Sequence, residues 1–251
     1  MKTLLITGGT GKFGSVLVEH FLRKDFYVIF TSTSDEKIKK LIDDYSGLGG
    51  EITGLKVDFT DENSVKSVVC QLLEKGLYVD YLINNARSIA SLAIEADGRV
   101  LRKNFLAEYL LDVVVPYELT VELAHCNSSS LKSVVNIGSQ YGIVAANPKL
   151  YSDHAQQSPI HYGLAKAALV HLTKELAVRL AKHKIRVNCV AYGGVDGRVD
   201  ESFRDRYANL VPNKRMLSES EIPGPIEFLL GEESSAMTGQ VICADGGWTI
   251  W

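Results

Sequence analysis

Thr7-Gly8-Gly9-Thr10-Gly11-Lys12-Phe13-Gly14 directly follows the first short apolar run of the chain, at 3–7, and opens an amphipathic stretch at 13–24. Glycines at these spacings would let the chain turn tightly and bring its backbone close to a pyrophosphate at the start of a helix. A glycine-rich turn can also be a plain connector, but its place between the first strand and the first helix favours a nucleotide site. We therefore predict that Gly8, Gly11, Lys12, Phe13 and Gly14 contact a dinucleotide.

The same alternation of short apolar runs and amphipathic stretches continues to the end of the chain. We expect strands at 3–7, 27–31, 52–57, 81–84, 133–137, 185–190 and 241–244, and helices at 13–24, 35–45, 61–75, 101–125, 161–183 and 221–230. Continuous apolar strands separated by helices predict an α/β fold with a Rossmann-type doubly wound parallel sheet. No low-complexity linker divides the chain, so we expect a single domain over 1–251. Two insertions, 146–159 and about 193–220, read as irregular loops, and we take the second as the substrate loop.

Composition excludes several classes of function. Thirty acidic and 27 basic residues give a formal net charge of −3, whereas nucleic-acid-binding domains are usually clearly basic. No apolar run reaches the ~20 residues of a membrane span, and the N-terminus lacks a signal-peptide pattern. The four cysteines have no metal-ligand spacing, and their apolar neighbours predict buried free thiols and no metal site. We expect a soluble cytoplasmic protein with a small-molecule substrate.

Tyr162 and Lys166 carry the first indication of catalysis. They lie four residues apart in a segment that reads as helix, so the ammonium can sit beside the phenol and favour its ionised form. A tyrosine in that setting can move protons near neutral pH. The spacing also occurs by chance on exposed helix faces. Ser139, at the end of the fifth predicted strand, strengthens the catalytic interpretation, because the carboxyl ends of parallel strands face the ligand crevice.

Two other strand ends offer cofactor contacts. Asp58 follows the third strand and could either cap the next helix or hydrogen-bond an adenine ring. Asn84-Asn85-Ala86 follows the fourth strand, where a small residue would let a cofactor pass close to the backbone. We expect Asp58, Asn85 and Ala86 to belong to the dinucleotide site.

Together these motifs resemble the short-chain dehydrogenase/reductase superfamily, in its single-domain branch. The resemblance runs from Lys2 to Trp251 and includes the terminal Asp245-Gly246-Gly247. It implies that Tyr162 is the general acid/base, that Ser139 holds the reacting oxygen and that Lys166 binds the nicotinamide ribose. It also places Gly193 and Val195 at the cofactor. A hydride would pass between nicotinamide and a carbonyl or hydroxyl carbon.

The second half of the chain is similar to family members found in bacterial flagellin and surface-glycan sugar pathways. The similarity lies in Ser139-Gln140-Tyr141-Gly142, the loop 151–159, Val187-Asn188-Cys189 and Gly246-Gly247-Trp248. It implies a nucleotide sugar, a sugar phosphate or a nonulosonate-type substrate. Arg87, Tyr141 and Tyr192 are the predicted substrate contacts.

Four positions depart from the family pattern: Lys12, Arg87, Asp112 and Tyr192. Asp112 stands where the family's asparagine anchors a proton-relay water, and its charge would alter how Lys166 and Tyr162 titrate. Arg87 could pair with Asp112, or it could bind an anionic group of the substrate. Asn104 aligns less well with the relay position and reads as a plain surface or helix residue.

These departures leave three functions open. The serine, tyrosine and lysine are all present, which favours an enzyme that retains Asp112 in its catalytic set. The altered positions also allow a catalytically impaired cofactor-binding sensor or scaffold. The spacing of the glycine turn allows a sugar epimerase or dehydratase of the longer branch, although 251 residues leave little room for its added substrate domain.

The end of the second strand decides the cofactor. An acidic side chain there would bind the ribose 2′-hydroxyl of NAD, but this chain has no acid until Asp35. Thr31, Ser32 and the nearby Lys12 would accommodate a 2′-phosphate, unless Lys12 is simply solvated. NADP(H) is therefore favoured and NAD(H) is possible.

The predicted helices 101–125 and 161–183 carry broad apolar faces. These faces could simply cover the sheet. In the family that the chain resembles, however, the two helices commonly pack against their copies, so we expect a homodimer or homotetramer.

Overall fold

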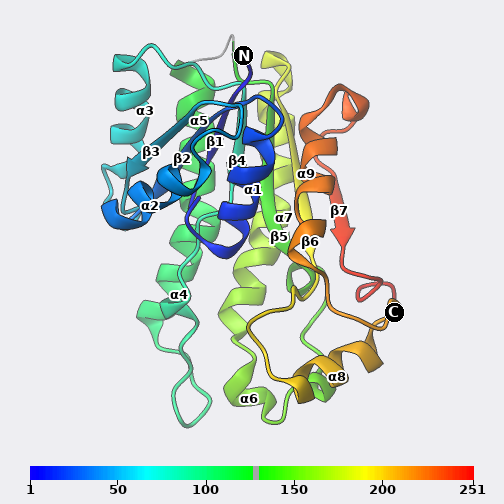
Figure 1. The fold of residues 1–251 in the computed structure, drawn as a ribbon. Helices are drawn as coiled ribbons and strands as arrows, with labels where there is room; N and C mark the ends of the chain where they lie inside the picture. Colours follow the sequence, from blue (N-terminus) through cyan, green and yellow to red (C-terminus); the bar gives the residue numbers. More distant parts are fainter. Residues whose placement is uncertain (127–129) are drawn as a thin grey trace.

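The computed structural model describes residues 1–126 and 130–251, which form one seven-stranded parallel sheet with helices on both faces (Figure 1). The strands are β1 Thr3–Ile6, β2 Tyr27–Ser32, β3 Ile52–Lys56, β4 Tyr81–Asn84, β5 Ser133–Ser139, β6 Arg186–Tyr192 and β7 Val241–Ala244. Their order in the sheet is β3-β2-β1-β4-β5-β6-β7. This confirms the predicted doubly wound fold.

The helices follow the predicted periodicity closely. They are α1 Lys12–Leu22, α2 Asp35–Tyr45, α3 Ser64–Glu74, α4 Arg102–Tyr109, α5 Val115–Cys126, α6 His154–Gln157, α7 Ile160–Leu180, α8 Glu201–Leu210 and α9 Pro223–Leu230. No helix of the described residues is long and apolar enough to span a bilayer.

Alternate residues of the central strands enter two separate hydrophobic layers, because successive side chains of a strand point to opposite faces. In β1, Leu5 packs in the layer under α3, α5 and α7, whereas Leu4 and Ile6 pack in the layer under α1, α2 and α9. Since both faces are covered, the strands read as continuous apolar runs rather than as an alternating pattern.

The segment predicted as an irregular loop at 193–220 contains the ten-residue helix α8, so that part of the prediction was wrong. Asp200 caps the helix by accepting a hydrogen bond from the N–H of Phe203, 2.8 Å away. Phe203, Tyr207 and Leu210 share one face and pack on a small apolar cluster that includes Leu150 and Trp248. The other insertion, 146–159, contains the short helix α6, His154–Gln157.

The predicted burial of the cysteines was also mostly wrong. Cys189 is buried, but Cys70, Cys126 and Cys243 are exposed. Apolar chain neighbours do not bury a residue on a helix, because adjacent residues point in different directions around its axis. Cys70 on α3 thus faces outward while its neighbour Val69 is in the core.

The expected helix at 101–125 is continuous but changes its geometry in the middle. A π-helical turn at Leu110–Val114 joins α4 to α5 and contains Asp112. Pro116 lies four residues after Asp112; in a regular α-helix its ring would clash with the carbonyl of residue 112. The wider turn relieves that clash, and such turns often occur at functional sites.

Candidate active site

The strand order reverses between β1 and β4, and the glycine turn lies at this point. Gly8 has φ of +68°, and a Cβ placed on Gly14 would lie 2.2 Å from the carbonyl oxygen of Gly8. Only glycine fits these two positions. Gly11 is the N-cap of α1, whose first N–H groups have no partner within the helix and are therefore suited to bind an anion.

The end of β2 is joined to the glycine turn by hydroxyl groups. The N–H of Gly8 donates to Thr31 Oγ1 at 3.0 Å, and the hydroxyls of Thr10 and Ser32 lie 2.7 Å apart. Asp35 is the nearest acid on this side, and its carboxylate pairs with Lys56. This strand end therefore presents small hydroxyls and no carboxylate of its own to a bound ribose.

Lys12 does not lie free beside that strand end. Its ammonium donates to the carbonyl oxygens of Val195, at 3.4 Å, and Asp196, and it lies 3.5 Å from a carboxylate oxygen of Glu219. Its side chain is only 12% exposed, so the solvated alternative is wrong. Lys12 instead connects the glycine turn to the segment after β6.

The end of β4 is held against the glycine turn. The N–H groups of Asn85 and Ala86 both donate to Thr7 Oγ1 at 2.9 Å, and the Asn85 amide donates to the carbonyl oxygens of Thr7 and Gly8. A Cβ on Gly8 would lie 2.9 Å from the Cα of Ala86. The two strand ends are thus packed backbone to backbone at the floor of the site.

Asp58 forms a turn with Thr60. Its Oδ1 accepts from the N–H and the hydroxyl of Thr60, and these hydrogen bonds hold the pKa of Asp58 below its usual range. The carboxylate therefore holds the turn after β3, several residues before α3 begins, and it also lines the cleft.

Lys166 is the centre of the predicted catalytic group. Its ammonium donates to Asp112 Oδ1 and to the carbonyl oxygen of Ile137, both at 2.9 Å, and it lies 5.8 Å from the ring centroid of Tyr162. Burial alone would lower the pKa of Lys166, but Asp112 and Tyr162 outweigh it and raise that pKa. Lys166 therefore stays positively charged.

Asp112 thus has Lys166 as its partner, and the sequence-based alternative of an Arg87–Asp112 pair is wrong. The Arg87 guanidinium instead stacks on the ring of Tyr162, 4.6 Å from its centroid. Within 1–126 and 130–251, no carboxylate lies within ion-pair distance of Arg87. An exposed cation stands directly over the phenol.

Ser139 ends β5 and is buried. Its oxygen accepts the N–H of Tyr141 at 3.2 Å, so the hydroxyl hydrogen remains available to a ligand. Asn104, expected to be a plain surface or helix residue, lies on α4, where it is buried and donates to the carbonyl oxygen of Ala93 at 3.0 Å. It fixes the loop before α4 and lies outside the cleft lining.

The substrate side is rich in tyrosines. The hydroxyls of Tyr141 and Tyr151 lie 2.6 Å apart, and burial raises the pKa of both. The hydroxyl of Tyr192 donates to the carbonyl oxygen of Ile222, and its ring packs edge-on against Phe13. Only the ring of Tyr192 is therefore left for a ligand.

The structure brings nearly all predicted site residues into one cleft of about 940 Å³ at the carboxyl ends of the strands, the lower end of Figure 1. The two exceptions are Gly14, which packs beneath the turn, and Asp112, which reaches the cleft through Lys166. Sequence reasoning missed several lining residues: Lys37, Tyr151, Arg198, Phe203, Tyr207 and Met216. The apolar spacing of 203, 207 and 210 was the signal that could have identified α8 as part of this wall.

Gly193 shows how closely this wall is packed. A Cβ there would lie 2.8 Å from both the Cα of Asp245 and the hydroxyl oxygen of Tyr207. That hydroxyl donates to Gln140 Oε1 at 3.0 Å and accepts the N–H of Gly194 at 2.8 Å. Tyr207 thus joins the segment after β6 to the end of β5, while Val195 pairs with Leu217 in an isolated bridge.

Comparison with known proteins agrees with this geometry. Residues 13–249 match the family model described as Enoyl-(Acyl carrier protein) reductase. The 3-oxoacyl-[acyl-carrier-protein] reductase FabG of Thermotoga maritima is 29% identical, over 99% of this chain and 98% of the relative. Post-translational flagellin modification protein A of Campylobacter coli is 25% identical, over 99% of this chain and 98% of the relative.

Two solved structures share the fold across the whole chain. A short-chain dehydrogenase of Leptospira borgpetersenii with bound NAD⁺ has a TM-score of 0.86 and 28% identity, covering 99% of this chain and 92% of that one. ElxO with NADP bound has a TM-score of 0.85 and 26% identity, covering 100% and 99%. With a family match from residue 13 to residue 249 and the strand order of a dinucleotide-binding sheet, the chain belongs to the short-chain dehydrogenase/reductase family of NAD(P)-dependent oxidoreductases.

Proposed function

We propose that this cytoplasmic oxidoreductase uses NADP(H) to interconvert a carbonyl and a hydroxyl group on an anionic sugar derivative, such as a sugar phosphate or nucleotide sugar of surface-glycan biosynthesis. Arg87 carries the proposal. Its guanidinium lies 4.6 Å from the Tyr162 ring centroid, lines the cleft, and has no carboxylate partner among the described residues. A substrate anion would supply that partner, and guanidinium groups bind phosphate and carboxylate in a bidentate manner.

The residues of the cleft fit a dinucleotide. The glycine turn leaves no room for a Cβ at residues 8 and 14, and the start of α1 offers unpaired N–H groups. The cleft residues that would hold the cofactor are Gly8, Gly11, Phe13, Thr31, Ser32, Asp58, Asn85, Ala86, Gly193 and Val195, and Gly14 supports them from beneath the turn. The nicotinamide would supply or accept the hydride.

The protein's own residues manage the proton. Ser139 donates its hydroxyl hydrogen to the reacting oxygen, because that hydrogen is not used in its bond with Tyr141, where the serine oxygen accepts. Tyr162 gives the proton to that oxygen in reduction and takes it back in oxidation. Lys166, held by Asp112 and Ile137, keeps a positive charge near the phenol and favours the phenolate that remains.

Two tyrosines in the wall of the cleft favour a sugar as the substrate. Tyr141 and Tyr151 offer flat rings with hydroxyl groups, a combination that suits the apolar faces and polar edges of carbohydrates. The similarity to a flagellin modification protein points the same way. We propose that the segment 193–220, with α8 and Arg198, closes the substrate side of the cleft.

Arg87→Gln should raise KM for a keto-sugar phosphate by about 10–100-fold, because a hydrogen bond to a charged group contributes about 1.5–3 kcal/mol. The loss should be much smaller for the same keto sugar without phosphate. Steady-state kinetics with both substrates measures this, and Arg23→Gln, an exposed arginine paired with Glu19, is the matched control. If a 3-oxoacyl thioester is turned over with higher kcat/KM than every sugar phosphate tried, the sugar proposal is wrong and a fatty-acyl substrate replaces it.

NADPH should bind at least tenfold more tightly than NADH. Thr31 and Ser32 leave space for a 2′-phosphate, and Lys37, which lines the cleft from α2, is a cation that can reach it while Lys12 is held elsewhere. Fluorescence titration of wild type and Lys37→Gln measures this: the substitution should weaken NADPH and leave NADH unchanged. A tenfold or greater preference of the wild type for NADH would refute the assignment.

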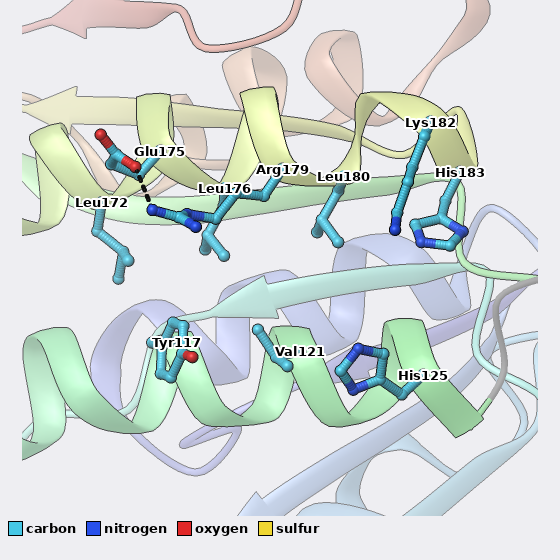
Figure 2. A pocket seen from close by; sticks show the side chains of 10 residues that line it. All are labelled: Tyr117, Val121, His125, Leu172, Glu175, Leu176, Arg179, Leu180, Lys182 and His183. Atoms are coloured by element: carbon cyan, nitrogen blue, oxygen red, sulfur yellow. Dashed lines mark hydrogen bonds and ion pairs between the residues drawn. The ribbon is translucent and has the colours of Figure 1, made fainter.

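We also propose that the protein forms a homodimer or homotetramer through α5 and α7. A groove of about 730 Å³ lies between these helices, and Figure 2 shows the side chains that line it. Nearby apolar side chains are exposed, including Tyr117 at 45% and Val178 at 78%. Tyr117→Glu should therefore yield monomers in light scattering at micromolar concentration, whereas Tyr78→Glu, on an exposed loop residue, should not. A monomeric wild type at that concentration contradicts the proposal.

A further inference from the structure

Behind the Lys166–Asp112 pair lies a second carboxyl group that the reaction does not directly use. Glu108, near the end of α4, is 1% exposed, and Asp112, in the π-helical turn, is 2% exposed. The ammonium of Lys166 donates to Asp112 and to a backbone carbonyl. Asp112 thus pairs with a buried cation, and Glu108, one helical turn earlier, is a second buried carboxyl group.

The contacts of Ser91 allow Glu108 to be protonated. The Ser91 oxygen lies 2.8 Å from the carbonyl oxygen of Ser88 and is also in hydrogen-bond contact with Glu108 Oε2. A hydroxyl has a single hydrogen, and a carbonyl oxygen can only accept. If Ser91 donates to Ser88, the contact with Glu108 needs a hydrogen from the carboxyl group itself.

The rest of the surroundings agrees with a neutral Glu108. Its Oε1 and Asp112 Oδ2 have no hydrogen-bond partner among the described residues. A buried carboxylate without donors is strongly disfavoured, and a protonated carboxyl group is much less so. Burial raises the pKa of Glu108, and the charge of Asp112 adds to this effect; Ser91, Arg87 and Lys166 oppose it without cancelling it.

We propose that Glu108 is a positioning residue that stays protonated in the resting protein and thereby leaves Asp112 as the sole anion beside Lys166. This inference rests on the proposed function. When Glu108 ionises as the pH rises, a second negative charge holds the Lys166 ammonium more strongly and draws it away from Tyr162. The ionisable groups around Glu108 are Asp112 on its own helix, Lys166 on α7, Arg87 after β4, and His161, which bonds to the carbonyl oxygen of Ser91.

The protonation of Glu108 can be measured without turnover. Infrared spectroscopy in D₂O should show a carboxylic-acid band in wild type that is missing in Glu108→Gln and shifts in Ser91→Ala. The folded state holds this proton above the ordinary carboxyl pKa of ~4.3, so its stabilising effect is lost as pH rises. The melting temperature of Glu108→Gln minus that of wild type should therefore increase by about 3–5 °C per pH unit. The increase should begin above pH ~4.3 and end at the pKa of Glu108 in the folded protein.

Glu74→Gln, an exposed glutamate on α3, is the matched control and should change neither readout. No acid band, or a melting difference that does not vary with pH, would overturn the protonated state. In the kinetic assay, the loss of activity as the pH rises should begin at a higher pH in Glu108→Gln than in wild type; an identical pH profile overturns the positioning role. If both physical readouts succeed but the wild type turns over no substrate, the failure belongs to the proposed function and not to Glu108.

Discussion

Tyr162→Phe is expected to lower kcat for hydride transfer by about 10²–10⁴-fold while leaving cofactor binding nearly unchanged. The substitution removes only the hydroxyl, so the ring that stacks under Arg87 remains. The reacting oxygen would then have a hydrogen bond from Ser139 but no proton to take up. Stopped-flow absorbance of the nicotinamide, with cofactor titration by fluorescence, separates these two effects.

Tyr78→Phe is the control for this experiment, because Tyr78 is 55% exposed and lies outside the cleft. It should match the wild type. If the wild type binds the cofactor but transfers no hydride to any keto sugar or 3-oxoacyl thioester, and Tyr162→Phe behaves identically, the enzyme assignment of Tyr162 fails. The protein would then be a cofactor-binding sensor or scaffold.

Lys166→Met is expected to destabilise the fold by about 3–5 kcal/mol and to abolish measurable activity. Removing one partner of a buried ion pair leaves the other charge without compensation. Asp112 is 2% exposed, and its second oxygen has no partner among the described residues, so its charge would have no donor left. Chemical denaturation, followed by tryptophan fluorescence and extrapolated to water, measures the loss.

The Lys166→Met/Asp112→Asn double variant gives the matching test. Neutralising Asp112 removes the uncompensated charge, so part of the lost stability should return although activity does not. A double variant that is less stable than Lys166→Met would mean that the ion pair contributes little and that Asp112 stabilises the fold by other contacts. The cycle also isolates the coupling between the two residues.

The sheet could be predicted from the sequence because its signals are local. The apolar runs of β4 and β7 coincide with the predicted 81–84 and 241–244 residue for residue. Helix α8 was missed because a polar, short helix gains its stability from packing on Leu150 and Trp248, which are distant in the chain. Local periodicity is weak where tertiary contacts decide the structure.

The site residues also differ in whether the sequence alone could predict their contacts. Tyr162 and Lys166 are one helical turn apart, so their relation was readable. The choice of Asp112 between Lys166 and Arg87 was not, because the ion pair joins residues 54 apart in the chain and depends on a π-helical turn. No pattern in the sequence indicated Glu108, because its proposed role depends on its contact with Ser91, 17 residues earlier in the chain.

The contact between Lys12 and Asp196 spans 184 residues and joins the first helix to the last third of the chain. A nascent chain that leaves the ribosome therefore cannot complete its cleft until β6 has emerged and paired with β5. Parallel sheets already assemble slowly, because their pairings are distant in sequence. Until then the glycine turn lacks its contact with the segment after β6. A cofactor that bound to this partial cleft could act as a template on which the later strands assemble.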